Sequence, residues 1–89
     1  MTDQPTKQQV HAHIGKRLFR RRSDLGLSLE EVATVAGVSF HQACEYEAGA
    51  AGMSAPRLRA LASMMGVSPA YFYRGLRPTA PLTALSAGN

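Results

Sequence analysis

The feature that most constrains the fold is a short turn between two helical segments, Ala36-Gly37-Val38-Ser39. Gly37 is suited to the positive φ that ends a helix, and the Ser39 hydroxyl is suited to cap the helix that follows. Val38 provides an apolar side chain between them. Such a connection holds two helices at a steep angle and leaves the N-terminal half of the second helix exposed. The segment therefore predicts a helix-turn-helix, with an ordinary pair of packed helices as the alternative.

The same capping signal marks the beginning of both helices. Ser28 is followed three residues later by Glu31, and Ser39 is followed by Gln42, which is the spacing of a capping box. These signals predict helices over about 29–36 and 40–48. The residues expected to face inward are small or apolar: Val32, Ala33, Ala36, Ala43 and Tyr46, with Cys44 half-buried.

Three more helices are predicted from apolar residues at helical spacing. One runs from about Val10 to Asp24, another begins near Ser54 and ends at Gly66, and a short fifth helix follows Ser68-Pro69. Their inward-facing residues are expected to be Val10, Ile14, Leu18, Leu25, Leu58, Leu61, Ala62, Met65 and Phe72. The expected organisation is all-α: a flexible arm over 1–9, one domain over 10–77 and a flexible tail over 78–89.

The charge of the chain is unevenly distributed along the sequence. The net charge is +4, which is compatible with a polyanionic partner. Six basic residues lie before residue 28, whereas residues 28–50 contain four Glu and neither Lys nor Arg. The sequence contains no apolar run long enough for a membrane span and no secretory signal, so no membrane partner is expected. Cys44 is the single cysteine, which rules out a disulfide within the chain and fits a reducing cytoplasm.

Nothing in the sequence indicates an enzyme. There is no nucleophile–base constellation, no Gly-rich phosphate loop and no pair of carboxylates suited to a cleft. His11 and His13 are two residues apart, so a helix points them to different faces, and His41 is remote in sequence. A metal site is therefore not expected, and neither is any other cofactor.

Two long segments resemble one family over most of the chain. They are IGKRLFRRRSDLGLSLEEVATVAGVSFHQACEYEAG and MSAPRLRALASMMGVSPAYFYRG, which together cover roughly Ile14 to Gly75. The matches include the Gly26-Leu27-Ser28 entry to one helix, Ala36-Gly37-Val38-Ser39 and the Gly66-Val67-Ser68 turn. With these residues the chain resembles the Cro/C1-type (XRE) regulators, closest to a branch common in alphaproteobacteria. The resemblance implies a five-helix fold like that of lambda repressor.

The resemblance also implies sequence-specific binding of double-stranded DNA by a cytoplasmic, nucleoid-associated bacterial regulator. The helix over about 40–48 would enter the major groove, and a homodimer would bind a palindromic operator. The implied base contacts are Phe40 with a thymine methyl group, His41 with guanine or a phosphate, Gln42 with adenine, and Glu45 with cytosine N4. The implied phosphate contacts are Arg17, Arg21, Ser28, Ser39 and Arg57. In the family Glu47 pairs with an arginine of the first helix, here Arg17 or Arg21.

The chain departs from the family pattern on the surface that would face DNA. Leu29 and Ala48 stand where relatives have residues that hold phosphate, the loop 50–53 has no basic residue, and Glu45 adds negative charge. Each missing phosphate contact weakens binding and lowers its salt dependence. The alternative is therefore a degenerate helix-turn-helix that binds a protein, such as RNA polymerase or a related regulator.

Large apolar side chains gather near the C-terminal end of the predicted domain. The candidate dimer interface there consists of Met64, Tyr71, Phe72 and Tyr73. The alternative is that Phe72 completes the core and both tyrosines lie on the surface.

Overall fold

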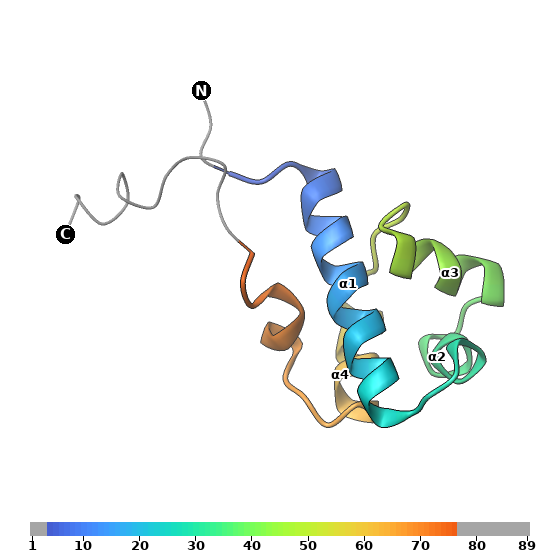
Figure 1. Cartoon of the computed structure of the whole chain (residues 1–89). Helices are drawn as coiled ribbons and strands as arrows, with labels where there is room; N and C mark the ends of the chain where they lie inside the picture. The colour runs from blue at the N-terminus through green and yellow to red at the C-terminus, as the bar shows by residue number, and fades with distance from the viewer. Residues whose placement is uncertain (1–3, 77–89) are drawn as a thin grey trace.

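A computed structural model describes residues 4–76, and all of its regular structure is helical (Figure 1). In chain order the elements are α1 (Lys7–Leu25), α2 (Leu29–Ala36), α3 (Phe40–Ala48), α4 (Ala55–Met64) and the 3-10 helix η1 (Pro69–Tyr73). The all-α class and the helix-turn-helix at the second and third helices are confirmed. The fifth helix differs from the expectation because it is a five-residue 3-10 helix rather than an α-helix.

The first helix begins at Lys7, three residues before its predicted start at Val10. Thr6 accepts a hydrogen bond from the Gln9 backbone N–H at 3.1 Å, and the Gln9 side chain accepts one from the Thr6 N–H at 2.7 Å. This capping box extends α1 back to Lys7, so residues 7–9 of the expected arm are helical. The expected tail over 78–89 lies outside the described residues.

Both predicted capping boxes of the helix-turn-helix are confirmed. The side chains of Ser28 and Glu31 exchange hydrogen bonds with each other's backbone N–H groups, and those of Ser39 and Gln42 do the same. Gly37 ends α2 with a φ of 72°, a conformation in which a side chain would be strained. The turn between α2 and α3 is therefore set by local chemistry at both of its ends.

The core lies where α1, α2, α4 and η1 meet, and α1 runs through the middle of the molecule (Figure 1). Its largest fully buried side chains are Phe72, Leu18, Leu61, Met65 and Val32. Every helix therefore contributes to one apolar cluster, and α3 contributes only Tyr46. Leu25, expected to face inward, is exposed. It is the last residue of α1, and the chain turns away from the core at the following Gly26.

A close backbone approach positions α3 against α1. A Cβ atom on Gly15 would lie 2.5 Å from the carbonyl oxygens of both Tyr46 and Glu47. Because real side-chain atoms do not approach carbonyl oxygens so closely, a residue larger than glycine would push the two helices apart. The angle at which α3 leaves the domain thus depends on Gly15.

None of the helices within residues 4–76 is both long and apolar enough to cross a membrane.

Candidate nucleic-acid interface

The helix α3 buries one side and exposes the other. Ala43 and Tyr46 are buried against the rest of the domain, whereas Phe40, His41 and Gln42 are exposed. Glu45 is partly exposed on the same outer side. The four residues predicted to contact bases therefore lie together at the surface, near the N-terminal end of α3.

Two of these residues form a pair along the helix. The Nε2 atom of His41 lies 3.6 Å from Oε2 of Glu45, one helical turn further on, and the His41 side chain is 85% exposed. Phe40 precedes them and is 51% exposed, which is unusual for a large aromatic side chain. The outer face of α3 thus combines an aromatic ring, an imidazole and a carboxylate.

The hydrogen bonds of Gln42 leave one half of its amide available. Its carbonyl oxygen Oε1 accepts the Ser39 backbone N–H at 3.3 Å, which fixes the side chain beside the N-terminus of α3. The amide NH₂ group makes no hydrogen bond to the described residues. Gln42 is therefore held in place as a hydrogen-bond donor.

Ser28 and Ser39 occupy equivalent positions at the N-termini of α2 and α3. Each hydroxyl oxygen accepts a hydrogen bond from the backbone, at 3.0 Å from Glu31 and 3.1 Å from Gln42. Each hydroxyl keeps its own proton to donate, and helix N-termini favour anions. Both serines are thus placed where a phosphate contact is chemically sensible.

Glu47 pairs with a different arginine from the two that were expected. Both of its carboxylate oxygens accept hydrogen bonds from Arg22, through Nε and, at 3.0 Å, through Nη2. Arg22 also donates to the Leu27 carbonyl oxygen at 3.1 Å. Hydrogen bonding to Glu47 raises the pKa of the Arg22 guanidinium, against the lowering effect of burial. This arginine therefore stays charged and ties α1, the following loop and α3 together.

Sequence reasoning missed Arg22, because the sequence does not show which side of α1 faces α3. Gly15 faces the carbonyl groups of α3, and Arg22 lies seven residues later, two turns along the same side of α1. Arg17 and Arg21 lie on another side of α1, where they meet the C-terminal part of the domain.

Arg17 and Arg21 bind backbone carbonyl groups within the domain. Arg17 donates to the Tyr71 carbonyl oxygen at 3.0 Å, and its guanidinium lies 4.0 Å from the centre of the Tyr71 ring. Arg21 donates twice to the carbonyl oxygen of Met65, at 2.9 and 3.0 Å. One turn earlier, His13 Nε2 lies 2.8 Å from the Arg74 carbonyl oxygen. The three side chains form a stripe on α1 that holds the segment from Met65 to Arg74.

The third predicted phosphate-binding arginine is placed differently. Arg57 belongs to the first turn of α4, is exposed, and donates through Nε to the Ala36 carbonyl oxygen at 3.3 Å. Ala36 is the last residue of α2, so this guanidinium lies beside the helix-turn-helix. Among the three predicted arginines, Arg57 is the one next to the expected DNA-binding surface.

Phe72 cannot serve in the dimer interface that was predicted to include it. Its side chain is completely buried and its ring packs edge-on against that of Tyr71, at 5.4 Å between ring centres. The core of its own protomer already removes this apolar ring from water, so no second protomer is needed to cover it. Met64 and Tyr71 are half-buried, and Tyr73 is 47% exposed. The candidate dimer surface is thereby reduced to Met64, Tyr73 and the edge of Tyr71.

No cluster of three potential metal ligands occurs within residues 4–76. His11 lies against the loop after α3, where a Cβ atom on Gly52 would overlap its imidazole ring. Cys44 is half-buried, as predicted.

A family model described as a helix-turn-helix domain matches residues 13–71. An uncharacterised transcriptional regulator in the ATPase CF(0) region of Rhodospirillum rubrum is 40% identical over 75 residues, which make up 84% of this chain and 69% of that protein. The HTH-type regulator y4wC of Sinorhizobium fredii is 34% identical over 64 residues, or 72% of this chain. The chain spans 45% of that relative's length.

Two solved structures share the arrangement of helices. The restriction-modification controller protein C.AhdI from Aeromonas hydrophila superposes with a TM-score of 0.64 at 26% identity, over 70% of this chain and 94% of that one. The clp gene regulator ClgR from Corynebacterium glutamicum gives a TM-score of 0.68 at 28% identity, over 78% of this chain and 70% of that one.

Proposed function

The chain belongs to the helix-turn-helix domain family of Cro/C1-type transcriptional regulators, and from this premise we propose that it binds double-stranded DNA sequence-specifically. The outer face of α3 lies in the major groove, where helix-turn-helix proteins read base edges. The observation that carries the proposal is the joint exposure of Phe40, His41, Gln42 and Glu45 on this helix. The protein then acts in the bacterial cytoplasm, at the nucleoid.

The side chains of α3 match the groups that bases present in the major groove. The free NH₂ of Gln42 suits an adenine acceptor, and the ring of Phe40 suits a thymine methyl group. Glu45 suits the N4 amino group of cytosine, and His41 suits a guanine acceptor or a phosphate. Ser28, Ser39 and Arg57 contact the phosphate backbone on either side.

A homodimer is the assembly that best suits DNA binding through α3. Few cations surround α3, so one protomer makes few phosphate contacts and binds weakly. Two protomers joined through Met64 and Tyr73 would double those contacts on a palindromic operator, with half-sites about one helical turn apart.

A selection from a random duplex library at low salt, followed by sequencing, tests the proposal. Enrichment of an inverted repeat is the expected result, and its spacing reports the separation of the two α3 helices. A folded protein that enriches no sequence would contradict DNA recognition by α3.

One observation favours a second candidate function, a helix-turn-helix that binds protein. The exposed surface of α2 and α3 carries the carboxylates of Glu30, Glu31 and Glu45 but no lysine or arginine. Such a surface suits a basic partner, such as a region of RNA polymerase or a related regulator. This function predicts no enriched duplex in the selection and retention of the partner by wild-type protein but not by a Glu30→Lys variant.

A further inference from the structure

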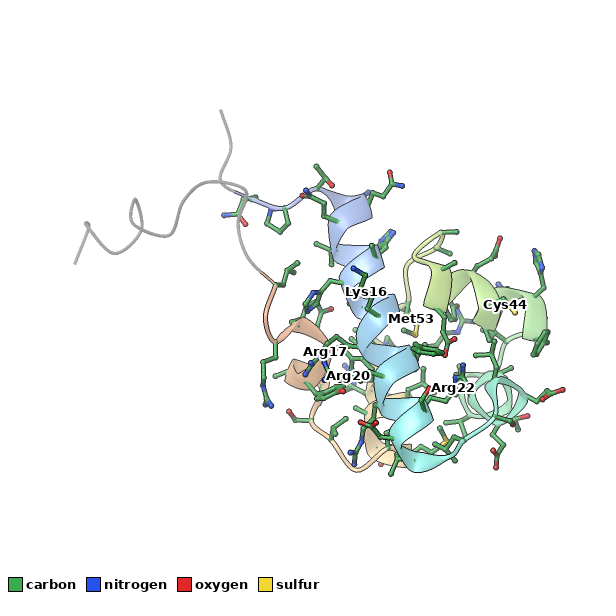
Figure 2. The ribbon with its side chains drawn as sticks, in the orientation of Figure 1. Lys16, Arg17, Arg20, Arg22, Cys44 and Met53 are labelled. Atoms are coloured by element: carbon green, nitrogen blue, oxygen red, sulfur yellow. The ribbon has the colours of Figure 1, made fainter. Side chains whose placement is uncertain are left out.

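The outer face of α1 combines cations with an exposed aromatic ring. Lys16, Phe19 and Arg20 fall within about one third of the helix circumference at 100° per residue, on the side opposite to the buried Leu18. Phe19 is 53% exposed. Lys16 and Arg20 lie on successive turns (Figure 2), and neither forms a hydrogen bond or ion pair with the described residues. We call these three residues the α1 face.

The outer face of α2 combines carboxylates with an exposed apolar side chain. Glu30, Glu31 and Val35 fall within about 140° of the α2 circumference, centred opposite to the buried Val32, Ala33 and Ala36. Val35 is 39% exposed. Neither carboxylate has a cation partner within residues 4–76, although Glu31 accepts the Ser28 N–H. We call Glu30, Glu31 and Val35 the α2 face.

We propose that these two faces bind each other between two copies of this chain. Lys16 and Arg20 of one copy pair with Glu30 and Glu31 of the next, and Phe19 packs against Val35. One contact thereby gives partners to both sets of unpaired charges and covers two apolar side chains. A nucleic acid on the α1 face would leave the carboxylates of the α2 face without a partner, so the observations favour a second copy.

The contact differs from the dimer surface around Tyr73 in both chemistry and location. The contact joins two different faces, so it can build assemblies larger than a dimer. It stops at a dimer only if a two-fold axis lets both faces of each copy pair at once. Its charged groups are exposed, so the contact is weak and sensitive to salt, with screening over about 8 Å at physiological ionic strength. It requires no DNA, and its failure would leave the proposed DNA-binding function untouched.

Two charge-reversed variants of the full chain provide the test. Lys16→Glu/Arg20→Glu makes both faces acidic, and Glu30→Lys/Glu31→Gln makes both faces basic while glutamine keeps the α2 capping box. Sedimentation velocity at about 50 mM salt measures self-association of each variant, of their equimolar mixture and of the wild type. Circular dichroism establishes that every variant is folded.

The wild type is expected to form species larger than the dimer joined through Tyr73 as its concentration increases, and to lose these larger species at about 500 mM salt. Each variant alone should associate at least about tenfold more weakly than the wild type, because like charges then face each other. Mixing the two variants should restore association, since each acidic face meets a basic one.

A control with the same change in net charge is Lys7→Glu/Arg59→Glu, which alters neither face and should associate like the wild type. The proposal is overturned if the mixture stays dissociated, or if this control loses association to the same extent. It is also overturned if Lys16→Glu/Arg20→Glu associates normally but weakens duplex binding, which would make the α1 face a phosphate contact.

Discussion

At the scale of single residues, the polar atoms of α3 differ in what they are free to do. The Gln42 oxygen is occupied by the capping box, whereas its NH₂ group is not. His41 is almost fully exposed and is restrained only by Glu45. A substitution at Gln42 therefore has two separable effects, one on the stability of α3 and one on base recognition.

Gln42→Ala and His41→Ala should relax the preferred sequence at one position each, by about 1–3 kcal/mol per lost base contact. Arg57→Ala should instead weaken binding to all sequences alike, since a phosphate contact carries no sequence information. Fluorescence anisotropy on the selected operator and on single-base variants measures both effects. Gln42→Glu is the matched control, because it keeps a capping oxygen but removes the NH₂ donor. If Gln42→Glu kept the wild-type base preference, Gln42 would act only as a cap.

The choice among neighbouring arginines was beyond the reach of sequence reasoning. The sequence offers four arginines between residues 17 and 22, and family resemblance says only that one of them meets Glu47. Which one does so depends on the rotation of α1 about its axis, and that rotation is set by the contact of Gly15 with α3. The side-chain pair thus follows from a backbone approach between segments about 30 residues apart.

At the scale of elements, the segments with strong local signals were predicted well. The beginnings of α2, α3 and α4 each have a serine cap within the sequence itself, and all three are confirmed. The start of α1 was missed because its capping box, Thr6 with Gln9, lies among polar residues that are typical of a flexible chain end. Pro69 and Phe72 indicated a helix but not its 3-10 form, since five residues allow little more than one turn.

Gly15→Ala should lower the stability of the domain by about 1–3 kcal/mol, because overpacking against two backbone carbonyl groups outweighs the better helix propensity of alanine. Urea unfolding followed by circular dichroism measures the change. Gly26→Asn is a suitable control, since it also adds a side chain on α1's end but meets open space and asparagine tolerates this conformation. Equal stability of Gly15→Ala and wild type would show that α1 and α3 do not approach as described.

Arg17→Met and Arg21→Met should reduce thermal stability without changing the salt dependence of DNA binding. Each loses hydrogen bonds that hold the segment from Met65 to Arg74 on α1, worth about 1 kcal/mol apiece. Loss of a phosphate contact would instead flatten the plot of log affinity against log salt by about one unit of slope. Anisotropy titrations from low to moderate salt separate these roles, and a flatter slope for either variant would restore it as a phosphate contact.

At the scale of the whole molecule, charge is segregated more sharply than the net value of +4 suggests. All the described glutamates lie on α2 and α3, while cations line the outer side of α1 and the beginning of α4. The sequence already showed this separation along the chain. It could not show that Lys16 and Arg20 lack partners, because pairing depends on which helix faces touch.

The proposed dimer rests on Tyr73, which stays exposed when Phe72 completes the core. Tyr73→Glu should separate the protomers, because it places a charge in an apolar contact, and should lower affinity for the full palindrome by about 100-fold. Affinity for an isolated half-site should stay unchanged, since α3 is intact. Tyr73 is a cleaner probe than Tyr71, whose ring also supports Arg17.

Sedimentation should be performed at about 500 mM salt, where the contact between the α1 face and the α2 face is screened and only the apolar dimer persists. Gln8→Glu adds the same charge on the first turn of α1 and should remain dimeric. If Tyr73→Glu also remains dimeric, the protomers meet on another surface. If Tyr73→Glu becomes monomeric but its affinity for the full palindrome is unchanged, DNA recognition does not depend on two linked α3 helices. The palindrome would then have to be bound by independent protomers.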